Sequence, residues 1–186
     1  MTAAVVIGAS AGAVQALSDI LPRLPAEFPL PILVVVHVPS APSGLTQLFS
    51  AKCAVAVVEP DDKEQIRPGT VYFAPPGYHL LVEPDASISL SSDEPVLFSR
   101  PSIDVLFESA ADAFGAELLG IVLTGANEDG SRGALAIEAA GGQILVEDPA
   151  TAYAAAMPTA ALARCATART LSLDAIADHL LGLVER

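Results

Sequence analysis

Three residues capable of hydrolytic chemistry each follow a short apolar run. Ser10 follows Val5-Val6-Ile7 within Gly8-Ala9-Ser10-Ala11-Gly12, His37 ends Ile32-Leu33-Val34-Val35-Val36, and Asp129 lies shortly after Ile121-Val122-Leu123. If the three runs are parallel strands of one sheet, their carboxyl ends share an edge, where open α/β folds place their sites. A serine, a histidine and an aspartate together are the composition of a hydrolase with a serine nucleophile.

Ser10 stands in the spacing G-x-S-x-G, between a predicted strand and a predicted helix. The glycines leave room for a tight turn that exposes the hydroxyl, and the backbone N–H of Ala11 would face a developing oxyanion. Because serine is also a common helix N-cap, the pattern alone leaves a nucleophile and an ordinary cap as two open interpretations.

His37 is the histidine that the pattern favours as a general base, because its strand is expected to pair with the strand before Ser10. A core histidine bonded to backbone is the alternative. His79, in a predicted hairpin, and His179, on the polar face of the last helix, are interpreted as structural or solvated. For the acid, Glu128 and Asp129 both qualify by type, and either could instead serve turn or N-cap chemistry before Gly130.

The sequence disfavours two other classes of protein, the common α/β hydrolases and the nucleotide-binding folds. The order serine, histidine, aspartate differs from the serine, acid, histidine order of the common α/β hydrolases. In a dinucleotide-binding fold, Ser10 would replace a glycine of the phosphate-binding turn, and His37 would replace the acid expected after the second strand. No Gly-Lys-Ser/Thr tripeptide of a Walker A loop occurs.

Length and composition indicate one globular domain over residues 1–186, with 52% hydrophobic residues. The longest aliphatic run has five residues and Met1-Thr2-Ala3-Ala4 carries no basic segment, so neither membrane insertion nor a signal peptide is expected. A formal charge of −13 disfavours nucleic-acid binding. Cys53 and Cys165 have no metal or redox motif, which favours free thiols in a reducing cytoplasm.

Alternation of strands and helices predicts an α/β fold: a doubly wound, mainly parallel sheet with an inserted antiparallel β-hairpin. Strands are expected over residues 3–8, 31–37, 54–58, 118–124 and 143–146. The hairpin is expected from residues 69–74 and 79–82 around Pro75-Pro76-Gly77, with 88–90 as a third antiparallel strand. Helices are expected after Ser10, with Val14, Leu17, Leu21 and Leu24 on one face, around 44–50, from Ser102 to Gly115, before Gly141, and from about Ser172.

Several ordered motifs, from about Val5 to about Leu181, carry a family resemblance. They are Ile7-Gly8-Ala9-Ser10, Val36-His37-Val38-Pro39, Pro68-Gly69-Thr70-Val71-Tyr72-Phe73-Ala74-Pro75, Arg100-Pro101-Ser102-Ile103-Asp104-Val105-Leu106-Phe107, Leu123-Thr124-Gly125 with Glu128-Asp129-Gly130, Ala139-Ala140-Gly141-Gly142, and Met157-Pro158. In this order and spacing the chain resembles the catalytic domain of the chemotaxis protein-glutamate methylesterases, the CheB type.

The resemblance implies a cytoplasmic serine hydrolase that demethylates glutamate methyl esters on the cytoplasmic helices of methyl-accepting chemotaxis receptors. Family members also deamidate receptor glutamines. By position, Ser10 would be the nucleophile, His37 the general base and Asp129 the orienting acid. The backbone N–H groups of Ala11 and Ala126 would form the oxyanion hole. No metal or organic cofactor is implied.

The resemblance also marks where this chain departs from the family. Typical members have threonine and glycine at Ala11 and Ala13, Met-Gly at Ala126-Asn127, and histidine at Ser99. The given sequence begins at the catalytic domain, without the receiver domain that restrains many family members. Either a stand-alone esterase or a fragment of a longer protein is then implied, and the start at Met1 favours the stand-alone esterase. Arg100 could bind a substrate oxygen or pair with a nearby acid.

There are two alternative functions. One is an esterase or amidase for another substrate, and the other is a non-catalytic scaffold in chemosensory signalling.

Overall fold

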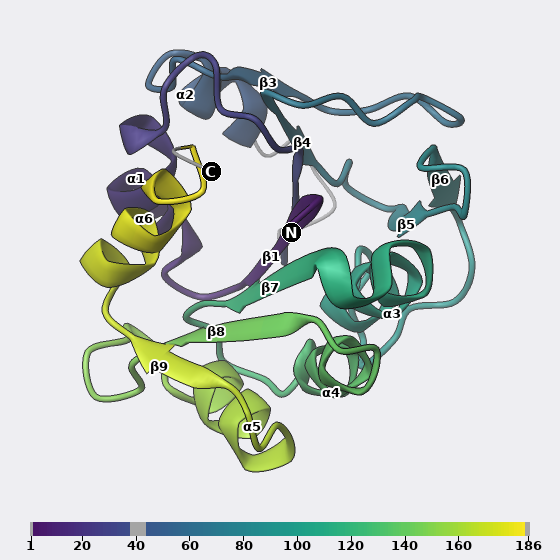
Figure 1. Cartoon of the computed structure of the whole chain (residues 1–186). Helices are drawn as coiled ribbons and strands as arrows, with labels where there is room; N and C mark the ends of the chain where they lie inside the picture. The colour runs from purple at the N-terminus through teal and green to yellow at the C-terminus, as the bar shows by residue number, and fades with distance from the viewer. Residues whose placement is uncertain (1, 38–43, 185–186) are drawn as a thin grey trace.

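The computed structural model describes residues 2–37 and 44–184 and is built around a parallel seven-stranded sheet (Figure 1). Its strand order is β3-β4-β2-β1-β7-β8-β9. The strands are β1 (Ala4–Ala9), β2 (Ile32–Val36), β3 (Ala56–Val58), β4 (Thr70–Phe73), β7 (Leu118–Val122), β8 (Gln143–Glu147) and β9 (Arg169–Leu171). A separate antiparallel pair consists of β5 (His79–Val82) and β6 (Ile88–Ser91).

Helices cover both faces of the sheet (Figure 1). One face carries α1 (Ala13–Ile20), α2 (Leu45–Ser50) and α6 (Leu173–Leu181); the other carries α3 (Ile103–Phe114), α4 (Ser131–Ala139) and α5 (Ala156–Arg164). Two short 3₁₀ helices, Leu21–Arg23 and Gly115–Glu117, lie between these elements. Successive side chains of a strand point to opposite faces, so β1 sends Val5 and Ile7 into one core and Ala4 and Val6 into the other.

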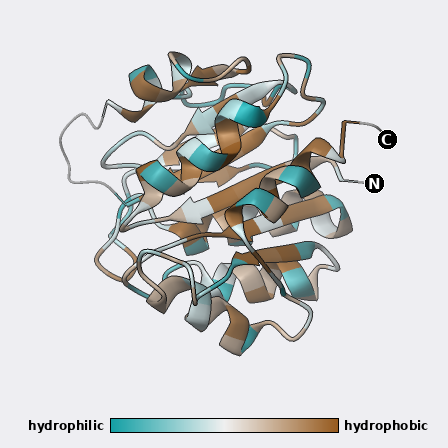
Figure 2. Ribbon diagram, turned by 90° about the vertical axis from the view of Figure 1, so that its left-hand side faces the viewer, coloured by the Kyte–Doolittle hydropathy of each residue, from teal (hydrophilic) through white to brown (hydrophobic). Residues whose placement is uncertain are grey.

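The predicted fold class is confirmed, because the apolar runs are central strands buried on both faces. All residues of β1, β2 and β7 are buried. Figure 2 shows the centre of the sheet as mainly brown, beneath helices that carry teal segments. β1 lies between β2 and β7, and the helices that follow β1 and β7 cover opposite faces. Such a switch point opens a crevice at the carboxyl ends of the strands.

The predicted hairpin between residues 69–74 and 79–82 is wrong in its pairing. β4 instead inserts in parallel between β2 and β3, and β5 pairs with β6. Val71, Tyr72 and Phe73 are each almost fully buried, which requires cover on both faces of the strand. The antiparallel insertion therefore exists, but it consists of β5 and β6, packed on α3.

Other differences from the predicted elements are local. α5 and β9 were not predicted, and Val14 is 45% exposed instead of belonging to the buried face of α1. α1 ends at Ile20, and Pro22 lies in the 3₁₀ helix that follows. The N-terminus of α6 agrees with the prediction, because the Ser172 side chain accepts a hydrogen bond from the amide of Ala175.

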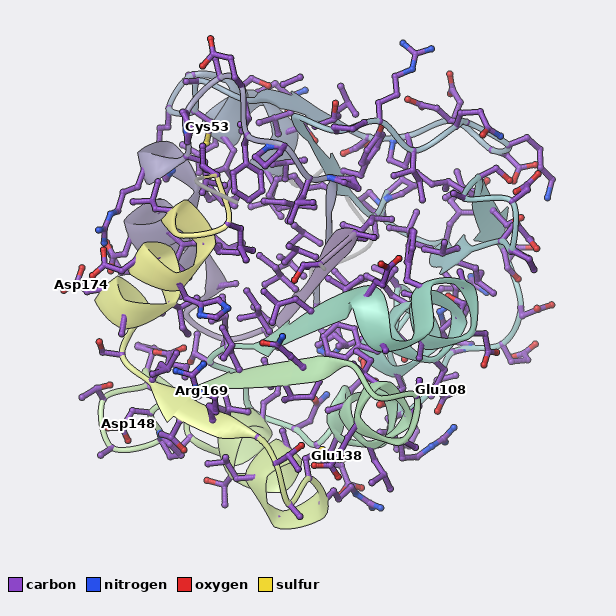
Figure 3. All side chains as sticks on the ribbon, in the orientation of Figure 1. Cys53, Glu108, Glu138, Asp148, Arg169 and Asp174 are labelled. Carbon is purple, nitrogen blue, oxygen red and sulfur yellow. The ribbon has the colours of Figure 1, made fainter. Side chains whose placement is uncertain are left out.

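Many acidic side chains lie at the surface of the molecule. Figure 3 shows the labelled Glu108, Glu138, Asp148 and Asp174 at the periphery, in keeping with the formal charge of −13. Within the described ranges, every helix is too short or too polar to cross a bilayer.

Candidate active site

Ser10 and His37 are neighbours because β1 and β2 pair in register. Ala9 lies opposite Val36, so the next residue of each strand comes alongside the other, and the His37 amide donates to the carbonyl of Ala9 at 3.1 Å. The Ser10 amide donates to the carbonyl of Thr124, just after β7, at 2.9 Å. Val38 and Pro39, which continue the histidine motif, lie outside the described residues.

Ser10 is not the N-cap of α1. That position belongs to Gly12, whose φ of +85° is in the left-handed region, and no side chain caps the helix. A Cβ on Gly12 would lie 2.6 Å from Cβ of Tyr153, and one on Gly8 would lie 2.3 Å from Cγ2 of Ile103. The two glycines therefore serve close packing on either side of Ser10.

The His37 ring is bonded to Asp129 through Nε2, at 2.7 Å from Oδ2. A carboxylate only accepts, so Nε2 carries the proton and the lone pair stays on Nδ1. Nδ1 is thus the nitrogen left to accept a proton from a neighbouring hydroxyl. Among the described residues, no hydrogen bond yet joins the Ser10 hydroxyl to this ring; such contacts often tighten only when substrate binds.

Asp129 is fully buried and is held by the N-terminus of α3. Its Oδ1 accepts from the Ser102 hydroxyl at 2.9 Å and from the Asp104 amide at 3.0 Å, and its Oδ2 accepts from the Ile103 amide at 2.7 Å. Burial opposes ionisation, but the bonds from His37 and from the two amides outweigh it and lower the pKa of Asp129. An anionic carboxylate beside the imidazole is therefore stable here.

The structure separates Asp129 from its alternatives. Glu128 is exposed, and the N-cap of α4 is Gly130, so Asp129 does not cap the helix that follows it. Oδ1 of Asn127 accepts a hydrogen bond from the Asp129 amide at 3.1 Å, and this bond stabilises the turn. Typical family members have glycine at the position of Asn127.

Asp104 makes the converse contact, from α3 to α4. Its Oδ1 accepts from the amides of Gly130 at 2.9 Å and Gly133 at 2.7 Å, while its Oδ2 is buried without a hydrogen-bond partner. Burial raises the pKa of Asp104 to about 6; the Gly133 amide opposes this shift and the charge of Asp129 adds to it. Asp129 thus lies at the N-terminus of α3, which contains Asp104, and Asp104 lies at the N-terminus of α4, which begins two residues after Asp129. The N-terminus is the positive end of a helix dipole.

His79 is structural, one of the two outcomes expected for it. It is buried, its Nδ1 accepts from the Ser102 amide at 3.1 Å, and its Nε2 contacts the carbonyl of Glu94 at 3.1 Å. These bonds define a neutral ring and hold Ser102 where its hydroxyl reaches Asp129.

Thr124 and Glu147 hold the turn that faces Ser10. Glu147 is buried and accepts the Thr124 amide at 2.7 Å. The Thr124 hydroxyl donates to the carbonyl of Ala11 at 2.8 Å and accepts from the Ala154 amide at 2.8 Å. In the described part of the chain, the amides of Ala11 and Ala126 have no acceptor, which is a requirement for the oxyanion hole predicted for them.

Two hollows meet at His37. One, of about 360 Å³, is lined by His37, Gly77, Pro95, Phe98, Ser99, Arg100 and Pro101. The other, of about 210 Å³, is lined by Ser10, Gly12, Ala13, Val14, Gln15, Val36, His37 and Leu45. A substrate that reaches Ser10 can therefore extend to either side of the imidazole.

Arg100 contacts backbone instead of the acidic side chain that one interpretation required. Its Nη1 donates to the carbonyls of Ser92 at 2.8 Å and Asp93 at 2.9 Å, and its Nε is buried without a partner. Because Arg100 also lines the larger hollow, a contact with substrate stays a prediction. Across residues 2–37 and 44–184, no group of three or more His, Cys, Asp or Glu side chains is placed to hold a metal ion.

Ser102, Asp104, Thr124 and Glu147 are site residues to which the sequence assigned no such role. Ser102 carried a helix-cap signal and Asp104 lay in a family motif, but neither pattern indicated a contact with Asp129. Thr124 lay beside the apolar run before Asp129, and Glu147 carried no signal beyond being an acid at the end of a predicted strand.

Comparisons with known proteins identify the family of this chain. The profile of the CheB methylesterase family matches residues 5–180. A putative protein-glutamate methylesterase/protein-glutamine glutaminase of Leptospira interrogans is 44% identical over 97% of this chain and 94% of its own length. A protein-glutamate methylesterase/protein-glutamine glutaminase of Bordetella parapertussis is 39% identical over 95% of this chain, which spans 52% of that relative.

A solved structure shows the same fold. The crystal structure of the CheB methylesterase catalytic domain of Thermotoga maritima matches 99% of this chain and 100% of its own, with a TM-score of 0.91 and 31% sequence identity. The family profile matches nearly the whole chain, and relatives are found both by sequence and by structure. The chain belongs to the CheB methylesterase family.

Proposed function

We propose that this protein is a serine hydrolase that demethylates glutamate γ-methyl esters on the cytoplasmic domains of chemoreceptors, in the cytoplasm. The observation that carries the proposal is the 2.7 Å bond between Nε2 of His37 and buried Asp129, with Ser10 at the end of the adjacent strand. This bond leaves an unprotonated Nδ1 as the base. Family membership and the names of the relatives support the ester as the substrate class.

The reaction follows from the geometry in two steps. Ser10 Oγ attacks the ester carbonyl carbon while Nδ1 of His37 takes the hydroxyl proton, and Asp129 stabilises the imidazolium. The amides of Ala11 and Ala126 donate to the oxyanion. The bond to the methoxy oxygen then breaks, His37 returns the proton to that oxygen, and methanol leaves a glutamyl ester on Ser10.

Water completes the cycle by the same route. His37 takes one proton from water as its oxygen attacks the acyl carbon, and the bond to Ser10 breaks as Oγ regains the proton. The product is a free glutamate side chain. A glutamine side chain would enter the same acyl intermediate with ammonia as the leaving group, so deamidation is a second reaction that this site could support.

Methanol release from a methylated chemoreceptor cytoplasmic fragment tests the proposal, with Ser10→Ala in parallel and a fluorophosphonate probe as an active-site label. The proposal expects methanol release and labelling by the native protein, and neither by the variant. Labelling without methanol release would point to an esterase or amidase with another substrate. Absence of both would indicate a non-catalytic scaffold, since an unactivated serine does not react with the probe.

A further inference from the structure

Large apolar side chains gather in the open around the Ser10–His37 site. Val14 is 45% exposed, Tyr153 is 82% exposed and Phe98 is fully exposed. They come from three segments far apart in the sequence: the first turn of α1, the loop before α5, and the turn before α3. We call these three residues the apolar rim.

Phe98 is held out by a turn whose backbone is unusual. Val96 and Ser99 exchange two backbone hydrogen bonds, of 3.0 and 2.8 Å, and the two residues between them have positive φ: 47° at Leu97 and 64° at Phe98. For residues with a Cβ this conformation costs about 1–2 kcal/mol each. The strained backbone of this turn lowers the stability of the fold. It places the exposed ring of Phe98 at the edge of the hollow that His37 also lines.

Tyr153 packs against the turn that follows Ser10. Its Cβ lies so close to Gly12 that no side chain fits there, and Gly12 follows Ser10 by two residues. The neighbouring Ala154 is bonded through its amide to the Thr124 hydroxyl and through its carbonyl to the Gly125 amide. Val14 lines the hollow that contains Ser10. The rim is thus tied to the same backbone that carries the catalytic groups.

We infer that the apolar rim is the docking surface for the protein that carries the ester, and that it binds apolar side chains flanking the methylated glutamate. This inference rests on the proposed function. A glutamyl side chain is short, so when its carbonyl reaches Ser10 the backbone of the substrate protein must lie over the rim. Exposed aromatic side chains around a cavity are typical of such contacts, in which a few anchors carry most of the binding energy.

The charge of the protein favours the same occupant. With 22 acids and 9 bases the protein is strongly anionic, and Figure 3 shows the labelled Glu108, Glu138, Asp148 and Asp174 at its periphery. A methylated glutamate has lost its negative charge, so an apolar segment around it meets the rim without repulsion. A small ester would fit within one hollow and contact only the part of the rim that lines it, Phe98 or Val14.

Binding of a fluorescently labelled, methylated chemoreceptor fragment to the Ser10→Ala protein tests the inference without requiring turnover. We expect Phe98→Ala, added to that background, to weaken binding at least tenfold. Leu135→Ala is the matched control, because Leu135 on α4 is 40% exposed and lines neither hollow; it should change binding less than twofold. Thermal unfolding of each variant checks that the fold is kept.

Kinetics on the otherwise native protein separate docking from chemistry. With the methylated fragment, Phe98→Ala should raise KM, whereas with the methyl ester of an N-acetylated glutamate amide its loss in kcat/KM should be several-fold smaller. Equal losses on the two substrates, unchanged binding, or no binding of the fragment by Ser10→Ala would overturn the inference. Failure of the proposed function differs from these results, because the native protein would then release no methanol from the methylated fragment.

Discussion

Replacing Asp129 by asparagine isolates the charge that acts on His37. The carboxylate accepts four hydrogen bonds: Ser102 and Asp104 donate to Oδ1, Ile103 and His37 to Oδ2. An asparagine has only one accepting oxygen. With that oxygen at the Oδ2 position, His37 and Ile103 keep their acceptor, but the new NH₂ group faces the Asp104 amide, and a buried donor loses its partner.

The magnitude follows from the distance between the two charges. Unit charges 2.7 Å apart attract by about 6 kcal/mol at an effective dielectric constant of about 20, which bounds what Asp129 contributes to an imidazolium at His37. A neutral amide oxygen retains about half of such a bond. About 3 kcal/mol is then lost in the transition state, which lowers kcat by about 10². The unpaired Asp104 amide should cost a further ~1–3 kcal/mol in the free energy of unfolding.

The assay is methanol release at saturating substrate, with urea unfolding of the same preparations. Glu128→Gln is the control, since it removes an adjacent but exposed acid and should leave both quantities nearly unchanged. Retention of more than a tenth of the native kcat by Asp129→Asn would refute the assigned role of the charge. A loss as large in Glu128→Gln would transfer the role to that residue.

Three further perturbations test buried groups in the site and elsewhere in the fold. Burial, assisted by the charge of Asp129, raises the pKa of Asp104 to about 6, so the folded protein holds a proton that the unfolded chain releases between about pH 4 and 6. Native stability should fall with rising pH across that window, and Asp104→Asn should gain about 1–3 kcal/mol on the native protein by pH 7.5 in urea titrations; parallel curves would contradict this. Gly8→Ala would place Cβ 2.3 Å from Ile103, so we expect about 1–3 kcal/mol less stability and reduced kcat, measured together. Burial raises the pKa of the Cys165 thiol to about 11 and that of Cys53 above its usual value, so both should react with a disulfide reagent at pH 7.5 far more slowly in the folded protein than in urea.

The central strands were predictable because the sheet buries both of their faces. Ile32–Val36 and Leu118–Val122 have no polar alternation, which is typical of interior parallel strands. The pairing of Thr70–Phe73 was not predictable, because Pro75-Pro76-Gly77 suits a hairpin and nothing local shows that this strand inserts between β2 and β3. β9 was missed because it is a short, mostly exposed edge strand.

The site divides in the same way between local and distant determinants. Ser10 and His37 follow paired strands, so their proximity required only the register of β1 and β2. Asp129 lies several residues beyond β7, and no periodicity determines which of two adjacent acids turns inward. That choice depends on donors at the start of α3, more than 20 residues earlier in the chain, whose position only the packed structure defines.

Reciprocal hydrogen bonds between two carboxylates and the N-termini of α3 and α4 explain how buried Asp129 stays ionised and oriented. Asp129 accepts from the first amides of α3 and Asp104 from those of α4, so each helix end fixes the acid of the other. These donors are backbone groups of packed helices and need no reorganisation when His37 becomes charged, which is the condition for electrostatic stabilisation of a transition state. This arrangement buries a second carboxyl group, that of Asp104, and burial destabilises its charged form and raises its pKa. The contact between Asp129 and His37 is therefore a property of the α3–α4 pair. The family motif around Ser102 supports the proposed triad of Ser10, His37 and Asp129, although none of its side chains takes part in the proposed proton transfers.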